Sequence, residues 1–175
     1  MKGKLLWIAI VLLTIWAMKR YYADAGADEL WWILSPTARL AGGTAGVWFA
    51  AEPGAGYLSR GHMFLIEKSC AGLNFMIAAF AMLAFVWRRR VTGFSSGALV
   101  LAGSLLTAYA AAIVVNAARI TIAMWLQAHP FAAARLTPAQ AHRLAGIVVY
   151  FAGLVLLHEL VLRWQRGAVS WRRSV

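Results

Sequence analysis

The feature that most constrains the fold is a set of apolar stretches, each about as long as a helix that crosses a bilayer. Such a helix needs about 20 mostly apolar residues, because the hydrocarbon core is roughly 30 Å thick and a helix rises about 1.5 Å per residue. The stretches cover residues 5–22, 29–51, 71–87, 97–126 and 144–162. We therefore expect an all-α integral membrane protein, a bundle of about five apolar helical segments.

The second stretch departs from this pattern because Ser35, Pro36 and Arg39 interrupt it. An arginine at the centre of a span costs about 2.5 to 3.5 kcal/mol on insertion scales. The segment is therefore either a full crossing or a broken, interfacial or re-entrant element. Polar connectors follow at 52–69 and 127–142, and no internal repeat divides the chain. Residues 1–175 are predicted to form a single multi-spanning domain.

Composition supports a membrane location. Hydrophobic residues make up 62% of the chain, and 17 Lys+Arg against 6 Asp+Glu give a formal charge of +11. The basic residues cluster at the ends of apolar stretches, which is typical of short cytoplasmic loops and argues against a nucleic-acid-binding surface. The first 22 residues resemble a signal peptide but lack a small-residue cleavage site, so we expect a retained anchor.

The arginines also predict an orientation. Arg88 to Arg90 and the arginine-rich C-terminus belong on the cytoplasmic side of the cell's inner membrane, which leaves both polar connectors outside. The N-terminus is outside if the second stretch crosses fully and inside if it is re-entrant.

Three residues from three separate spans are expected at a common depth. Counted from the basic residues at about 1.5 Å per residue, Cys70 lies roughly 27 Å away, Arg119 roughly 35 Å and His142 roughly 31 Å. A thiol, a guanidinium and an imidazole are therefore predicted to converge in one shallow pocket at the outer face.

Cys70 is the only cysteine, so no internal disulfide forms. It stands immediately before an apolar run, and we expect it at the N-terminus of the third span, where unpaired amides and the helix dipole favour a thiolate. The alternative is a cysteine that only fills space. Asn74, one turn further on, is predicted to donate an amide N–H to an oxyanion. Gly72 and Gly146 are predicted to allow close approach of helices.

Arg119 lies inside an apolar span, and ionisable residues in such places are candidates for functional sites. Asn116, three residues earlier, shares its helix face and is a predicted supporting residue. The alternative is an arginine whose side chain reaches to the outer headgroups. The proposed role of Arg119 is to keep Cys70 ionised or to stabilise an oxyanion.

His142 begins the last span, where it is placed to act as general base and then as general acid. His62 and His129 lie on the same side and compete for this role. His158 is near the cytoplasmic end and is predicted to be a packing or interfacial residue.

The stretches SCAGLNF around Cys70, NAARI around Arg119 and HRLAGIVVYF around His142 together resemble the exosortase and archaeosortase family. Members of that family are multi-spanning proteins with cysteine, arginine and histidine in this order on the outer side. The stretches WILSPTA and GYLSRGH further resemble the short subfamily called exosortase K. The resemblance covers roughly residues 29–160, and the chain is shorter than the larger members.

The resemblance implies a membrane cysteine peptidase or transpeptidase. Its partners would be exported proteins whose C-terminal sorting signal consists of a short motif, a transmembrane helix and a basic tail. Cleavage would proceed through a thioester on Cys70, with Arg119 as electrostatic stabiliser and His142 as base and acid. Membrane lipids surround such an enzyme, and no metal or other cofactor is required, because the sequence has no ligand cluster of the usual spacing.

Two other classes of function remain open at this point. One is a small haem- or quinone-binding membrane subunit, which would need two histidines at matching depth on facing helices. The other is a structural or transport component in which Arg119 lines a path. In a transport component Cys70 would be replaceable without loss of function.

Overall fold

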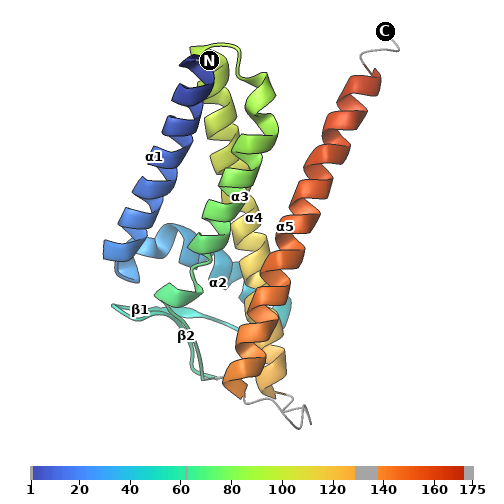
Figure 1. Cartoon of the computed structure of the whole chain (residues 1–175). Coiled ribbons are helices and arrows are strands. Elements are labelled where there is room, and N and C mark those ends of the chain that lie inside the picture. The colour runs from blue at the N-terminus through green and yellow to red at the C-terminus, as the bar shows by residue number, and fades with distance from the viewer. Residues whose placement is uncertain (1, 62, 129–137, 172–175) are drawn as a thin grey trace.

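The computed structural model describes residues 2–61, 63–128 and 138–171. Over this part of the chain it forms five α-helices and one three-stranded antiparallel sheet, with short 3₁₀ turns between them (Figure 1). The elements in order are α1 Lys2–Asp24, η1 Asp28–Leu30, α2 Trp31–Ala45, β1 Ala50–Glu52, β2 Gly56–Ser59, β3 Phe64–Ile66, η2 Lys68–Cys70, α3 Leu73–Val86, η3 Trp87–Arg90, α4 Phe94–Ala128 and α5 Pro138–Trp171.

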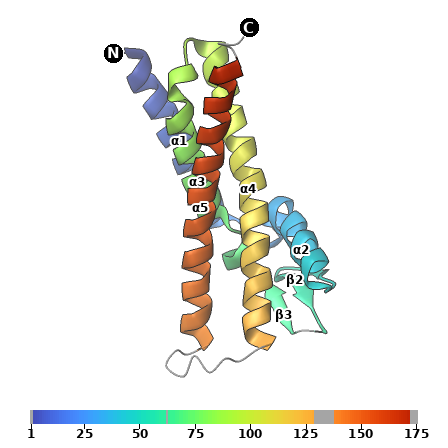
Figure 2. The same ribbon diagram turned by 90° about the vertical axis from the view of Figure 1, so that its right-hand side faces the viewer.

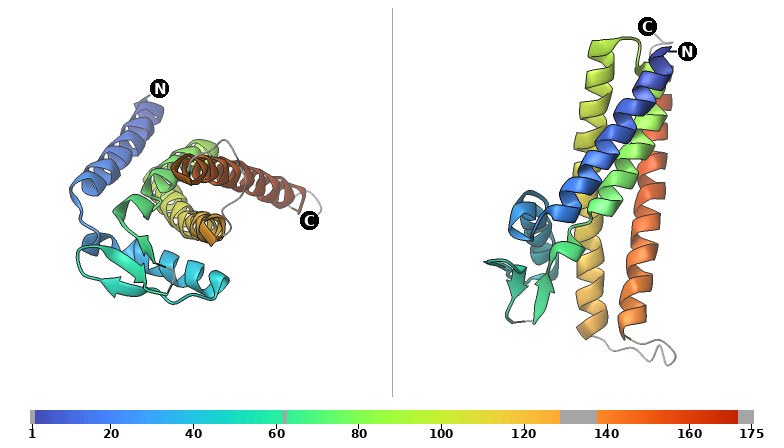
Figure 3. Two further views of the ribbon diagram at one scale, coloured as in Figure 1. Left: turned by 90° about the horizontal axis from the view of Figure 1, so that it is seen from below. Right: turned by 60° about the vertical axis from the view of Figure 1, so that its left-hand side comes forward.

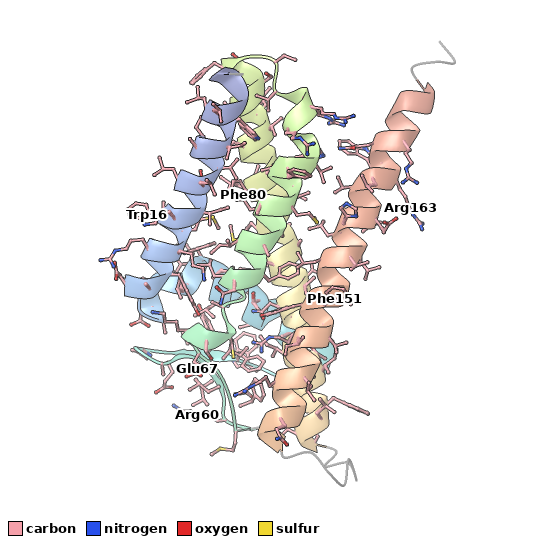
Figure 4. The ribbon with its side chains drawn as sticks, viewed as in Figure 1. Trp16, Arg60, Glu67, Phe80, Phe151 and Arg163 are labelled. Atoms are coloured by element: carbon pink, nitrogen blue, oxygen red, sulfur yellow. The ribbon has the colours of Figure 1, made fainter. Side chains whose placement is uncertain are left out.

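Four helical segments are long and apolar enough to cross a membrane, and they coincide with four of the five predicted stretches. They are Leu5–Asp24, Lys68–Arg90, Phe94–Ala128 and Arg143–Arg166. Many of their large apolar side chains face outward. Trp16 on α1 is 64% exposed and Phe151 on α5 is 70% exposed, whereas Phe80 on α3 is fully buried (Figure 4). A bilayer would solvate such a surface, whereas water would not.

The second predicted stretch folds differently from the other four. Its helix α2 has 15 residues, which gives a length of about 22 Å, too short for a full crossing. It ends at Gly46, whose φ of 67° is in the left-handed region that favours glycine. Figure 2 shows α2 beside the half of α4 that leads to Ala128. The start of α1, the end of α5 and the α3–α4 connection lie at the opposite end of the molecule (Figures 1 and 3).

Pro36 lies inside α2 and has no backbone N–H, so the carbonyl of Trp32 loses its usual helical partner. The hydroxyl of Tyr109 on α4 donates a hydrogen bond of 2.7 Å to this carbonyl. The rings of Trp32 and Tyr109 also pack at 5.7 Å between centroids. A side chain of α4 therefore replaces the missing helix bond and holds α2 against the bundle.

The sheet was not predicted, and the expectation of an all-α fold is wrong for residues 50–66. Strand β2 pairs with β1 on one side and with β3 on the other. Each strand has only three or four residues, so the alternation of apolar and polar side chains is too short to stand out in the sequence. Ile66 at the end of β3 is fully buried, and the chain runs directly from it into the turn that contains Cys70.

Candidate active site

Cys70 is the last residue of the short η2 turn, Lys68–Cys70, which we call the cysteine turn; Ala71 and Gly72 separate it from Leu73, where α3 begins. Its amide donates to the carbonyl of Glu67 at 2.8 Å. Its thiol is free and partly buried. The prediction that Cys70 occupies the helix terminus needs correction, because Gly72 caps α3 in the left-handed conformation and separates the cysteine from the first helical turn. The sheet and the turn, rather than the helix, determine where the thiol lies.

Gly72 cannot be replaced by another residue without disturbance, for two reasons. Its φ of 70° is unfavourable for a residue with a Cβ. A Cβ at this position would also lie 2.9 Å from Cγ of Asn116, a side chain of α4. Glycine therefore allows the cysteine turn to lie directly against α4, as the sequence predicted for a close approach.

Asn116 is fully buried and links the cysteine turn to α4 and α5. Its Nδ2 donates to the backbone carbonyl of Cys70 in a short contact. Its Oδ1 accepts two hydrogen bonds, one from Nε of Arg119 at 3.1 Å and one from the hydroxyl of Tyr150 at 2.8 Å. One amide thus connects the cysteine turn, the arginine and the last helix.

Arg119 lies between α4 and α5. Its guanidinium carbon is 5.4 Å from the centroid of the Tyr150 ring, and its Cδ is 3.6 Å from where a Cβ on Gly146 would be. Glycine at that position therefore leaves room for the arginine side chain. The Nη2 atom is buried, and no described residue accepts a hydrogen bond from it. An unpaired buried donor is costly, so this end of the guanidinium is suited to receive an anionic group.

Sequence reasoning did not identify Tyr150. A signal was nevertheless present, because Tyr150 is a polar-tipped side chain in an apolar run, four residues after Gly146 and eight after His142. At about 3.6 residues per turn, these three positions follow one face of a helix.

His142 lies in α5, one turn before Gly146, and its backbone position is therefore on the face of α5 that meets Arg119. Its side chain lies outside the described part of the structure. His62 and His129, the two competing residues, also lie outside it. His158 is partly exposed on α5 and its Nδ1 is 3.8 Å from a carboxylate oxygen of Glu159.

A second set of contacts joins the cysteine turn to the end of α1. The ammonium of Lys68 donates to the carbonyl of Ala23 at 3.1 Å and lies 5.2 Å from the centroid of the Tyr22 ring, while the Tyr22 hydroxyl donates to the Lys68 carbonyl. Asn74 is exposed, and its Oδ1 accepts a hydrogen bond from Lys19 at 3.2 Å. Asn74, the predicted oxyanion donor, therefore bonds to α1. The amide that contacts Cys70 and Arg119 is that of Asn116.

Polar groups also lie next to the thiol itself. The Ser69 hydroxyl donates to the Glu67 carboxylate at 2.7 Å and its oxygen is 3.8 Å from Sγ of Cys70. Because the hydroxyl proton is used on Glu67, the oxygen faces the sulfur as an acceptor and can accept a hydrogen bond from the thiol. Within the described residues, no three His, Cys, Asp or Glu side chains come together in a way that could hold a metal ion.

An open cavity of about 380 Å³ lies between α2 and α4, lined mainly by apolar atoms of Leu40, Thr44, Val114, Ala117, Ala118, Thr121 and Ile122. At about 100° per residue, the α4 residues in this set lie on the side of the helix opposite Asn116. The cavity is therefore separate from the cysteine site.

Comparisons of the chain with family models, with curated proteins and with solved structures give no match.

Proposed function

We propose that this protein is a membrane-embedded cysteine peptidase or transpeptidase of the exosortase type, which cleaves C-terminal sorting signals of exported proteins. One observation carries the proposal. Asn116 binds the backbone of Cys70 with one end of its amide and Arg119 with the other, so a nucleophile and a cation from distant parts of the sequence share one buried link. Two of the three residues expected to perform the chemistry are thereby neighbours.

The reaction uses these groups in a fixed order. The Cys70 thiol gives its proton to His142, and the thiolate forms a C–S bond to the scissile carbonyl carbon. The free end of the Arg119 guanidinium stabilises the resulting oxyanion. The C–N bond then breaks, and His142 returns its proton to the leaving amine. Water or an acceptor nucleophile attacks the thioester and gives a proton to His142, the C–S bond breaks, and His142 returns that proton to the Cys70 sulfur.

The lengths of the helices support a position of this chemistry near a membrane surface. About 22 residues of α4 separate Phe94 from Asn116, or roughly 33 Å, which is close to the thickness of the hydrocarbon core. With Arg88 to Arg90 in the cytoplasm, Asn116 lies at the outer boundary of the core. We therefore place the protein in the inner membrane with its active site on the outer face. A substrate helix in the same bilayer presents its scissile bond at a constant depth.

The test is the substitution Cys70→Ala in cells that make a substrate with a C-terminal helix and a basic tail. The size of the substrate is followed by immunoblotting. Met63→Ala is the matched control, because Met63 is a sulfur-containing residue that is 82% exposed in the same connector. We expect Cys70→Ala to stop processing at a normal level of membrane protein and Met63→Ala to leave it unchanged. Continued processing without the thiol would reject the peptidase and leave ligand binding or transport as the better explanation.

A further inference from the structure

Tyr150 contacts both of the groups that surround the cysteine turn. Its hydroxyl donates to Asn116, and its ring lies below the guanidinium of Arg119. The ring also packs on Phe75 of α3, with 5.4 Å between centroids. One side chain of α5 therefore touches α3 and two polar residues of α4.

The hydroxyl of Tyr150 helps to hold the Asn116 amide in place. An amide oxygen has two lone pairs, and both are used here, by Tyr150 and by Nε of Arg119. Rotating the amide by 180° would point its NH₂ group at Nε of Arg119, which only donates, and its oxygen at the carbonyl of Cys70, which only accepts. Both contacts would then be repulsive, so Arg119 and the Cys70 carbonyl set the orientation of the amide, and the Tyr150 hydroxyl, as the second donor to the amide oxygen, keeps that oxygen in position.

The same contacts restrict Arg119. The guanidinium is bound through Nε, covered on one side by the Tyr150 ring and approached by the backbone of Gly146. Its Nη2 remains without an acceptor among the described residues. The guanidinium is therefore fixed at Nε, and its Nη2 end is held in a single direction.

We propose that Tyr150 is a positioning residue that orients Asn116 and Arg119 with respect to Cys70, and this inference rests on the proposed function of the site. Tyr150→Phe keeps the ring but removes the hydroxyl, so Asn116 loses one of its two donors and Arg119 gains freedom. We expect the turnover rate of processing to fall about 10- to 100-fold, as is typical when a catalytic group is displaced by a fraction of an ångström to one ångström. KM should stay unchanged, because the hydroxyl bonds to Asn116 and not to a substrate.

A second measurement needs no substrate. Cys70 is the only thiol in this 175-residue chain, so its rates of alkylation by anionic iodoacetate and by neutral iodoacetamide can be compared in detergent micelles. A guanidinium oriented near the thiol attracts the anion and raises the iodoacetate/iodoacetamide rate ratio. We expect Arg119→Gln to lower this ratio several-fold and Tyr150→Phe to lower it most of the way to the value of Arg119→Gln.

Tyr109→Phe is the matched control, because Tyr109 also makes one hydroxyl bond to another helix and one ring contact, but away from the cysteine turn. It should keep the wild-type ratio and the wild-type turnover rate. If Tyr150→Phe does not accumulate in the membrane, Tyr150→Met is used in its place, because it also lacks the hydroxyl and an unbranched apolar side chain can fill the space of the ring; it should lower the ratio as well.

The outcomes separate the two proposals. A Tyr150→Phe ratio equal to that of Tyr109→Phe would overturn the positioning role, and so would an unchanged ratio in Arg119→Gln. If Cys70→Ala leaves processing intact while the alkylation ratios change as expected, the peptidase assignment fails and the positioning of Arg119 by Tyr150 stands.

Discussion

The cysteine turn contacts α1 on one side and α4 on the other, and the two sets of contacts differ in how deeply they are buried. Toward α1, the contacts of Lys19, Lys68 and Asn74 involve side chains at or near the surface. Toward α4, the hydrogen bond to the turn comes from a fully buried amide, that of Asn116. Exposed polar contacts contribute little to stability, whereas removal of one partner from a buried set leaves the others unpaired. We infer that Asn116 anchors the turn and that α1 only steadies it.

The largest expected effect is at Asn116. Asn116→Leu keeps the branched shape of the side chain but leaves the Cys70 carbonyl, the Tyr150 hydroxyl and Nε of Arg119 without their partner. We expect a loss of about 2 to 4 kcal/mol in the free energy of unfolding, since each unpaired buried group costs about 1 to 3 kcal/mol and some will find new partners. Reversible unfolding of the purified protein in detergent measures it. A loss below 1 kcal/mol would show that the buried side of the turn is not its anchor.

A smaller effect is expected at Gly72. Gly72→Ala introduces strain at a positive φ and a contact with Asn116, and we expect a loss of about 2 to 3 kcal/mol. Gly46→Ala is the matched control, because Gly46 has nearly the same φ of 67° but nothing within 4 Å of an added Cβ. Its loss should be about 1 kcal/mol. Equal losses for the two variants would mean that the contact with Asn116 carries no energy.

The smallest effect is expected on the α1 side. Lys19→Ala removes the hydrogen bond to the exposed Asn74, and the change in the free energy of unfolding should stay within about 0.5 kcal/mol. The alkylation ratio of Cys70 should also remain at the wild-type value. A destabilisation as large as that of Asn116→Leu would reverse the ranking of the two sides.

The sequence was sufficient to locate the four long helices because their length and apolar character follow from the thickness of a bilayer. Cys70, Asn116 and Arg119 were identified for a similar reason, since polar groups in or beside apolar runs are few and conspicuous. The position of Cys70 just before the third span was predicted, but the sheet and the cap at Gly72, which separates Cys70 from the first turn of α3, were not foreseen, because both depend on short turns. Tyr150 was missed because its partner Asn116 is 34 residues away in the chain, and only packing of α4 on α5 brings them together.

The pairing of Pro36 with Tyr109 affects how related sequences can vary as well as how this chain folds. The proline removes a backbone donor in α2, and the tyrosine of α4 supplies a replacement for the carbonyl of Trp32. If another residue replaces Pro36, its own N–H restores the helix bond and the tyrosine hydroxyl is no longer needed. If Tyr109 loses its hydroxyl while Pro36 remains, the carbonyl of Trp32 has no hydrogen-bond donor and α2 is destabilised. The two positions are therefore expected to covary in proteins that share this ancestry, 73 residues apart, as a paired signature by which a related chain can be recognised when little else in its sequence agrees.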